Sequence, residues 1–161
     1  MSPRAAWRLE SLGFGTVYDY KDGKLDWLAA GFATEGTNAQ KTRAGPLARK
    51  DVPTCRLDER LAGVRERVHA AGWEAAVVVN SERVVLGLLR SKELAADGER
   101  LIEEVMRPGP STFRPYVPAA DVAKTMVDRK LESSPVTTSD GRLVGLILQK
   151  DAVEAGAEHG R

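Results

Sequence analysis

The chain repeats itself once, and this internal repeat limits the possible folds more than any other feature of the sequence. A shift of 58 residues, with no gap, places Gly87 on Gly145, and the same shift aligns Glu74 with Glu132. Each copy is too short to bury the apolar face of its own sheet, so the two copies are expected to pack against each other. Two copies predict a closed pair, because a longer array would need more of them.

Each copy carries the pattern of a β-hairpin followed by a helix. In the second copy, Asp140-Gly141 lies between two runs rich in Val, Thr, Leu and Ile, at residues 133–138 and 143–148. An Asp-Gly pair in this setting is the strongest short-range hairpin signal. Residues 149–157 are then expected to form a helix. With the apolar helical pattern that precedes each hairpin, the predicted order is β-α-β-β-α per copy, and the predicted fold class is α/β (α+β).

The composition excludes several classes of protein. The chain has 161 residues, 42% hydrophobic and 29% charged, with a net charge of +1, which argues against a general electrostatic nucleic-acid binder. No apolar run is long enough for a membrane span, so no membrane or nucleic-acid partner is expected. The single cysteine, Cys55, cannot form an internal disulfide, and no Cys/His cluster suggests zinc. A cytoplasmic location and no required cofactor are expected.

The N-terminal part has a different pattern. Ser2 and Pro3 are typical of a helix start, and Gly13 is expected to end that helix. A short strand is predicted at residues 17–20 and a second helix at 24–30. The predicted α-β-α order is a fragment of an α/β unit, because its strand lacks neighbours.

Residues 1–34 resemble the C-terminal part of a rhodanese-like (sulfurtransferase) domain. The resemblance rests on Ser2-Pro3-Arg4-Ala5-Ala6 and on the pattern Gly23-x-x-x-Trp27-x-x-x-Gly31. The family's catalytic cysteine would precede Ser2, and Cys55 does not match that position. Sulfur transfer needs a thiolate, so no such activity is expected. The segment would then be a remnant, an artificial boundary or a mis-assigned start.

Residues 48–158 resemble a CBS domain pair (tandem cystathionine β-synthase-type domains, also called a Bateman module). Three motifs carry the resemblance: residues 106–109, Met-Arg-Pro-Gly; residues 134–136, Ser-Pro-Val; and residues 140–145, Asp-Gly-Arg-Leu-Val-Gly. The resemblance implies two motifs packed as a pseudo-twofold disc with two clefts. In this family such clefts often bind AMP, ADP, ATP, S-adenosylmethionine or NAD, and the pairs commonly dimerise and regulate another protein without catalysis.

The expected organisation has four parts. Residues 35–50 show no apolar period and are predicted to be a solvated linker. The division is therefore 1–34, the rhodanese-like remnant; 35–50, the linker; 51–105, the first CBS motif; and 106–158, the second CBS motif.

The resemblance also implies the ligand-binding residues. The family's ribose pattern is Gly-h-h-Ser/Thr-x-x-Asp, with h apolar. The second copy keeps Asp151 but has Leu148 at the hydroxyl position, whereas the first copy has Arg90 and Glu93 at the two polar positions. The positions that match the adenine slot are Thr112, Ser134 and Val136 in the second copy and Thr54, Ala76 and Val78 in the first. The apolar ones equally fit ordinary core packing, and Asp151 equally fits a helix cap.

These observations lead to a regulatory hypothesis. The chain is expected to be a non-catalytic module that senses an adenosine-containing small molecule, with the better cleft in the second copy. The alternative is a dimerisation or protein-interaction module with empty clefts; a sulfurtransferase remnant is a third interpretation. A homodimer is expected because two apolar helix faces, Leu61/Val64/Val68 and Val122/Met126, are predicted to be only partly used within one chain. The regulated protein is not identified by the sequence.

Overall fold

The computed structural model describes residues 3–18, 23, 27, 32–33, 35–36 and 41–157 of the chain. Helix α1 (Pro3–Ser11) forms where it is predicted, and Gly13 follows it with a φ of 91°. Val17 and Tyr18 are not in a strand, so the strand predicted at residues 17–20 is wrong for its two described residues. In the second N-terminal helix, Trp27 is helical, and the rest of the prediction lies outside the described residues.

The two repeats form the elements predicted for them. The first contains β1 (Thr54–Cys55), α4 (Leu61–Ala70), β2 (Ala76–Val79), β3 (Val85–Leu89) and α5 (Ser91–Leu94). The second contains α7 (Ala119–Asp128), β5 (Ser133–Thr137), β6 (Leu143–Leu148) and α8 (Gln149–Ala157). Between them lie α6 (Ile102–Val105) and β4 (Arg107–Pro108), and α3 (Ala44–Leu47) precedes the first repeat. Both hairpins are antiparallel, as predicted, and Gly141 has the positive φ, 86°, that its turn requires.

The two sheets have the same strand order. The first runs β1-β2-β3-β4, and the second contains β5-β6. Single bridges extend the second sheet at both edges: Phe113 pairs in parallel with Val136, and Arg49 pairs antiparallel with Leu146. These bridges correspond to β1 and β4 of the first sheet after the shift of 58 residues. The mixed α+β fold predicted from the sequence is therefore confirmed.

The segment that precedes each repeat crosses to the sheet of the other repeat. Two sets of antiparallel pairs show this exchange, and the members of each set are related by the same shift: Arg49 with Leu146 and Arg107 with Leu88; Arg43 with Pro118 and Leu101 with Arg60. At the hairpin tips, Val84 pairs with Arg142, its own equivalent in the other copy. Contacts that return in equivalent pairs define a pseudo-twofold axis through these tips.

The segment before the first repeat corrects one prediction. Residues 42–50 are not a solvated connector, because they contain α3, and Ala44 and Ala48 are buried against the second repeat. The backbone of Arg49 exchanges two hydrogen bonds with Leu146, of 2.9 and 3.0 Å. This part of the expected linker is structurally an edge of the second repeat. The other proposed boundaries remain predictions.

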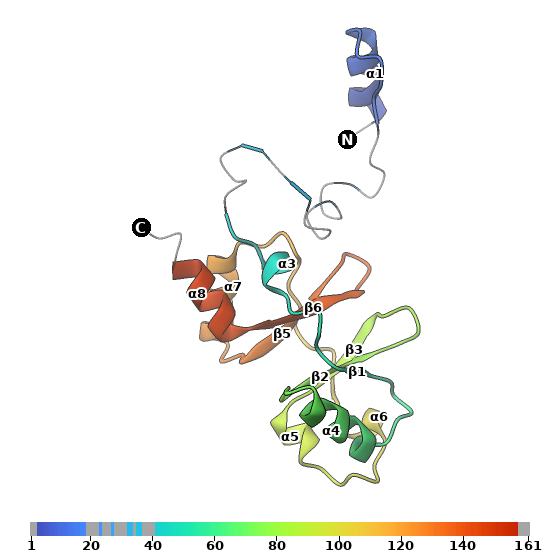
Figure 1. Ribbon diagram of the computed structural model, residues 1–161, viewed down its shortest axis with the longest axis vertical. Helices are drawn as coiled ribbons and strands as arrows, with labels where there is room; N and C mark the ends of the chain where they lie inside the picture. The colour runs from blue at the N-terminus through green and yellow to red at the C-terminus, as the bar shows by residue number, and fades with distance from the viewer. Residues whose placement is uncertain are drawn as a thin grey trace.

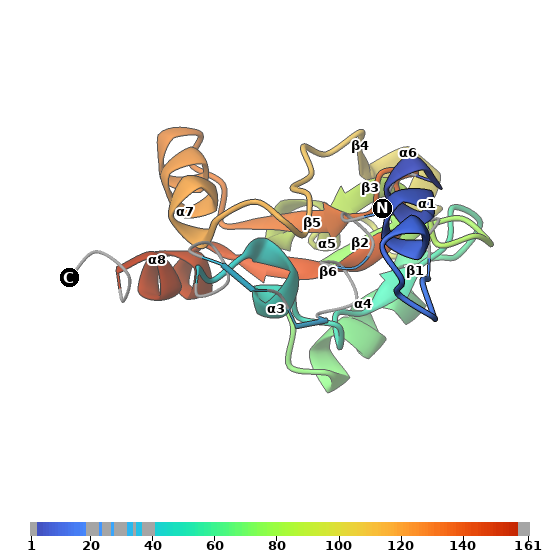
Figure 2. The ribbon, with the colours of Figure 1, turned by 90° about the horizontal axis from the view of Figure 1, so that it is seen from above.

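Each repeat has its own core, and Figures 1 and 2 show α3, α7 and α8 around β5 and β6, and α4 to α6 around β1 to β3. Leu143 and Leu146 of β6 belong to the first core, so the sheets pack against each other. The faces expected to remain for a dimer are not available. Their five residues are at most 1% exposed: Leu61, Val64, Val68, Val122 and Met126. Among the described residues, no helix is long and apolar enough to cross a bilayer.

Candidate functional site

A cavity of about 630 Å³ lies between the repeats. Its walls contain pairs of residues that the shift of 58 relates: Glu74 and Glu132, Ala75 and Ser133, Arg90 and Leu148, Ser91 and Gln149. These residues start β2 and β5 or follow the ends of β3 and β6, so the cavity is at the end of the axis opposite the hairpin tips. Its volume lies within the range of about 300–1,000 Å³ that small-molecule sites occupy.

One wall of the cavity is aromatic and basic. Trp73 is buried in the first core and lines the cavity, and the guanidinium of Arg49 lies 5.9 Å from the centre of its ring. Arg49 also donates two hydrogen bonds to Asp151, of 2.8 and 3.1 Å. This bond to Asp151 is the main reason that the pKa of Arg49 is raised. The crossing segment thus brings a cation to the predicted ribose carboxylate.

Arg90 enters the cavity from the first repeat and reaches the second. Its guanidinium donates a 2.7 Å hydrogen bond to the carbonyl oxygen of Ser133, while its Nε is buried and has no hydrogen-bond partner among the described residues. Burial is the main cause that lowers the pKa of Arg90, and the nearby positive charge of Arg107 adds to the effect. Arg90 is therefore a desolvated cation held at the boundary of the repeats.

The structure brings together the strand residues predicted for the second cleft. Ser134 donates a 2.8 Å hydrogen bond to Ser111, next to Thr112, and the Thr112 hydroxyl lies 3.3 Å from that of Thr137. Val136 is fully buried in the second core. Asp151 lies in the first turn of α8 and is bound to Arg49.

The residues predicted for the first cleft fall into two groups. Thr54 lies on β1 beside β2, where Ala76 and Val78 are fully buried in the first core. Glu93 accepts a 3.0 Å hydrogen bond from the backbone N–H of Arg90 and so stabilises the start of α5. Of the nine predicted ligand residues, only Arg90 lines the 630 Å³ cavity. The other assignments remain predictions.

Several cavity residues were not predicted as ligand residues: Arg49, Trp73, Glu74 and Glu132. A signal for two of them was present, because Glu74 and Glu132 align in the repeat and each precedes a hairpin strand. Arg49 had no such signal, since its role depends on a segment that crosses between repeats.

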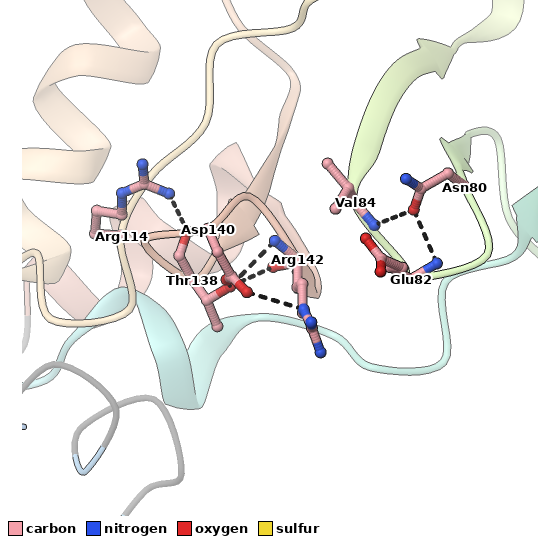
Figure 3. A network of polar contacts seen from close by, with 7 residues as sticks. All are labelled: Asn80, Glu82, Val84, Arg114, Thr138, Asp140 and Arg142. Carbon is pink, nitrogen blue, oxygen red and sulfur yellow. Dashed lines mark hydrogen bonds and ion pairs between the residues drawn. The ribbon is translucent and has the colours of Figure 1, made fainter. Parts of the chain in front are cut away.

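The opposite end of the axis is closed by two polar turns (Figure 3). The Asn80 side chain accepts hydrogen bonds from the backbone N–H groups of Glu82 and Val84. In the other turn, the Thr138 hydroxyl bonds to Asp140, and Asp140 forms a 2.9 Å ion pair with Arg142. The hydroxyl of Thr138 is the main cause that lowers the pKa of Asp140. These contacts hold the hairpins and leave no cavity role for the turns.

Cys55 does not provide a nucleophile. It is buried in the first core, and burial raises the pKa of its thiol to about 12. The part of the chain that the structure describes also contains no group of three His, Cys, Asp or Glu residues suited to a metal ion.

Comparison with known proteins agrees with this architecture. Residues 102–158 match the family model of the CBS domain. CBSX2 from Arabidopsis thaliana, solved in complex with AMP, has a TM-score of 0.66 at 18% identity; the match covers 74% of this chain and 99% of that one. The CBS domain pair of protein MJ0100, solved with 5-methylthioadenosine and S-adenosyl-L-methionine, has a TM-score of 0.65 at 19% identity, covering 73% of this chain and 98% of that one.

A curated relative is much longer than the matched region. The inosine-5'-monophosphate dehydrogenase of Korarchaeum cryptofilum is 26% identical over 111 residues, and the match covers 68% of this chain and 23% of the dehydrogenase. The chain thus spans about a quarter of that enzyme. The class defined here is a protein with a CBS domain at residues 102–158 and the fold of CBS-pair proteins.

Proposed function

We propose that the chain is a CBS pair in which both repeats act as a regulatory module without catalysis of its own, sensing an adenosine-containing small molecule. The candidates are AMP, ADP, ATP, S-adenosylmethionine and NAD. The observation that carries the proposal is the 630 Å³ cavity that both repeats line. It occurs in a fold whose solved neighbours include complexes with AMP and with S-adenosyl-L-methionine.

The chemistry of the cavity supports an adenosine ligand. Trp73 provides an aromatic wall, and Glu74 and Glu132 provide acceptors for amino and hydroxyl groups. The cationic groups of Arg49, Arg90 and Lys150 line the same space and suit phosphate or carboxylate groups. The protein regulated by such binding, and a cytoplasmic location, are part of the hypothesis.

The ribose assignment can be tested at the two corresponding carboxylates. Asp151 is short and stays close to its backbone; Glu93 has one more methylene and already bonds to the Arg90 amide. Asp151 is occupied by Arg49, but a carboxylate has about four acceptor positions, so it can also accept ribose hydroxyls.

The test is titration calorimetry of AMP, ATP, S-adenosylmethionine and NAD with three proteins: wild type, Asp151→Ala and Glu93→Ala. Asp151→Ala is expected to weaken the best ligand about tenfold or more, and Glu93→Ala much less. Asp151→Asn is the matched control, because it keeps the size of the side chain. Equal affinities for wild type and Asp151→Ala would remove the ribose role, and no binding of any of the four compounds would reject the sensing function.

A second candidate function is a dimerisation or protein-interaction module. Val127 on α7 and Val153 on α8 are 53% and 43% exposed, which favours a contact through the helices of the second repeat. Sedimentation of wild type and Val127→Asp at tens of micromolar separates the two ideas. A monomer that binds ligand supports sensing alone, whereas a dimer that Val127→Asp dissociates and that binds no adenosine compound supports assembly.

The N-terminal segment is proposed to be a rhodanese-like remnant without sulfurtransferase activity. The buried thiol of Cys55, with its raised pKa, supports this proposal because sulfur transfer requires a thiolate. Thiosulfate:cyanide turnover that disappears in Cys55→Ser would contradict it.

A further inference from the structure

The two halves of the cavity differ in charge at one pair of corresponding positions. Arg90 follows β3, and its equivalent Leu148 ends β6; both line the cavity. The backbone surroundings are the same by symmetry, so the side chains alone make the two halves different. A ligand in this cavity meets a guanidinium on one side and a leucine on the other.

Arg90 has no opposite charge to balance it. No ion pair of Arg90 occurs among the described residues, and its hydrogen bond goes to the neutral carbonyl of Ser133. Its Nε is buried without a partner. Glu93 and Glu132 attract it at longer range, while Arg107 repels it. A desolvated cation with an unused donor is favourable for an anion that enters the cavity.

The other charged groups of the cavity are already paired or solvated. Arg49 is bound to Asp151, and Lys150 is exposed to water, where its charge is screened. Glu74 and Glu132 repel anions and accept hydrogen bonds from donors such as ribose hydroxyls or an adenine amino group. The cavity therefore has one position for an anionic group and another for a donor-rich group.

We propose that the cavity binds a single phosphorylated adenosine ligand per chain, with its phosphate at Arg90 and its nucleoside toward Glu74 and Glu132. The number follows from the shared walls, because one set of residues from both repeats encloses one space. This departs from the two equivalent clefts that the resemblance implies. The inference rests on the proposed function, and it adds the class of ligand, its number and its direction.

The experiment is calorimetry with AMP, adenosine and inorganic pyrophosphate. Wild type is compared with Arg90→Leu, which copies the residue of the other repeat, and with Arg142→Leu, which removes an exposed arginine at the far end of the axis. AMP should bind wild type at a ratio of one per chain and at least about tenfold more tightly than adenosine. In Arg90→Leu this preference should disappear while the affinity for adenosine stays within about twofold, and Arg142→Leu should behave like wild type.

The outcomes separate the inference from the proposed function. Equal affinities of AMP and adenosine, a preference that survives Arg90→Leu, or two ligands per chain would overturn the inference and keep the sensing function. If no adenosine compound binds but pyrophosphate binds in an Arg90-dependent way, the sensing function falls and the anion position stands. If nothing binds, both fall. Circular dichroism checks each fold, and Arg90→Gln replaces Arg90→Leu if that variant is unfolded.

Discussion

The two repeats share their backbone contacts and differ in the side chains that meet in the cavity. The crossing segments, strand orders and hairpin-tip contacts all recur after the shift of 58 residues. At the cavity, the first repeat contributes Trp73 and Arg90, where the second has Leu131 and Leu148. Backbone geometry is thus duplicated while recognition chemistry is not. The differences between repeats, more than their common motifs, indicate where a ligand is held and in which direction.

The same comparison applies to the left-handed backbone positions. Gly72 and Lys130 follow α4 and α7 at corresponding positions, with φ of 68° and 52°. In the turns, Arg83 and Gly141 correspond, with φ of 64° and 86°. Each repeat therefore has one glycine and one non-glycine at these positions. The backbone geometry is maintained by the surrounding fold even where the residue is not the preferred one.

The largest expected difference concerns Cys55, whose equivalent in the second repeat is Phe113. The thiol has a pKa raised to about 12, so the native protein should react with a disulfide reagent at pH 8 at least about 100-fold more slowly than the urea-unfolded chain. Between the ordinary thiol pKa and about 12, only the unfolded chain releases this proton, so the free energy of unfolding should fall as pH rises.

Labelling kinetics and urea titrations from pH 8 to 11 measure both effects. Cys55→Ala is the control, because it lacks the part of the pH slope that comes from the thiol. Labelling of the native protein as fast as that of the unfolded chain would show that the first repeat does not exclude solvent at this position.

A smaller difference is expected between the glycines at which the crossing segments approach the sheets. A Cβ on Gly145 would lie 2.6 Å from the backbone oxygen of Arg49, whereas a Cβ on Gly87 would first meet the flexible Met106 Sδ at 2.4 Å. Gly145→Ala should therefore cost about 2–3 kcal/mol and Gly87→Ala about 1 kcal/mol. The reason is that a backbone segment with its hydrogen bonds must move in one case and mainly a side chain in the other.

Urea unfolding with an unchanged m-value gives both free energies. Gly63→Ala is a suitable control, since its Cβ would meet nothing within 4 Å. If Gly87→Ala were the more damaging variant, Met106 would be the less adaptable neighbour, and the comparison would be reversed.

The smallest difference is expected at the left-handed positions. Arg83→Gly and Lys130→Gly should each stabilise the protein by about 0.5 kcal/mol, because glycine removes backbone strain but loses more entropy on folding. Gly72→Ala and Gly141→Ala should each destabilise it by about 1 kcal/mol. Thermal unfolding of the four variants tests this, and a loss of stability in both glycine variants would show that the Arg83 and Lys130 side chains contribute more than their strain costs.

Local signals in the sequence were sufficient for much of the fold. Asp140-Gly141 predicted the second hairpin, the change of polarity after Leu148 predicted α8 at residues 149–157, and the gap-free repeat predicted two packed copies. These features depend on turn chemistry and on periodicity within a few residues, which is why they can be read along the chain. Ser2-Pro3 and Gly13 likewise predicted α1.

The cavity and the crossing segments were decided by tertiary structure. Arg49 and Asp151 are 102 residues apart in the chain, and nothing local to either predicts their ion pair. Residues 42–50 look like a linker because their few apolar groups are small, yet Ala44 and Ala48 are buried by close approach to the second repeat. The dimer faces expected from Leu61 and Val122 were wrong for a related reason: helical periodicity shows that a face is apolar, but which partner covers it depends on the packing of distant segments.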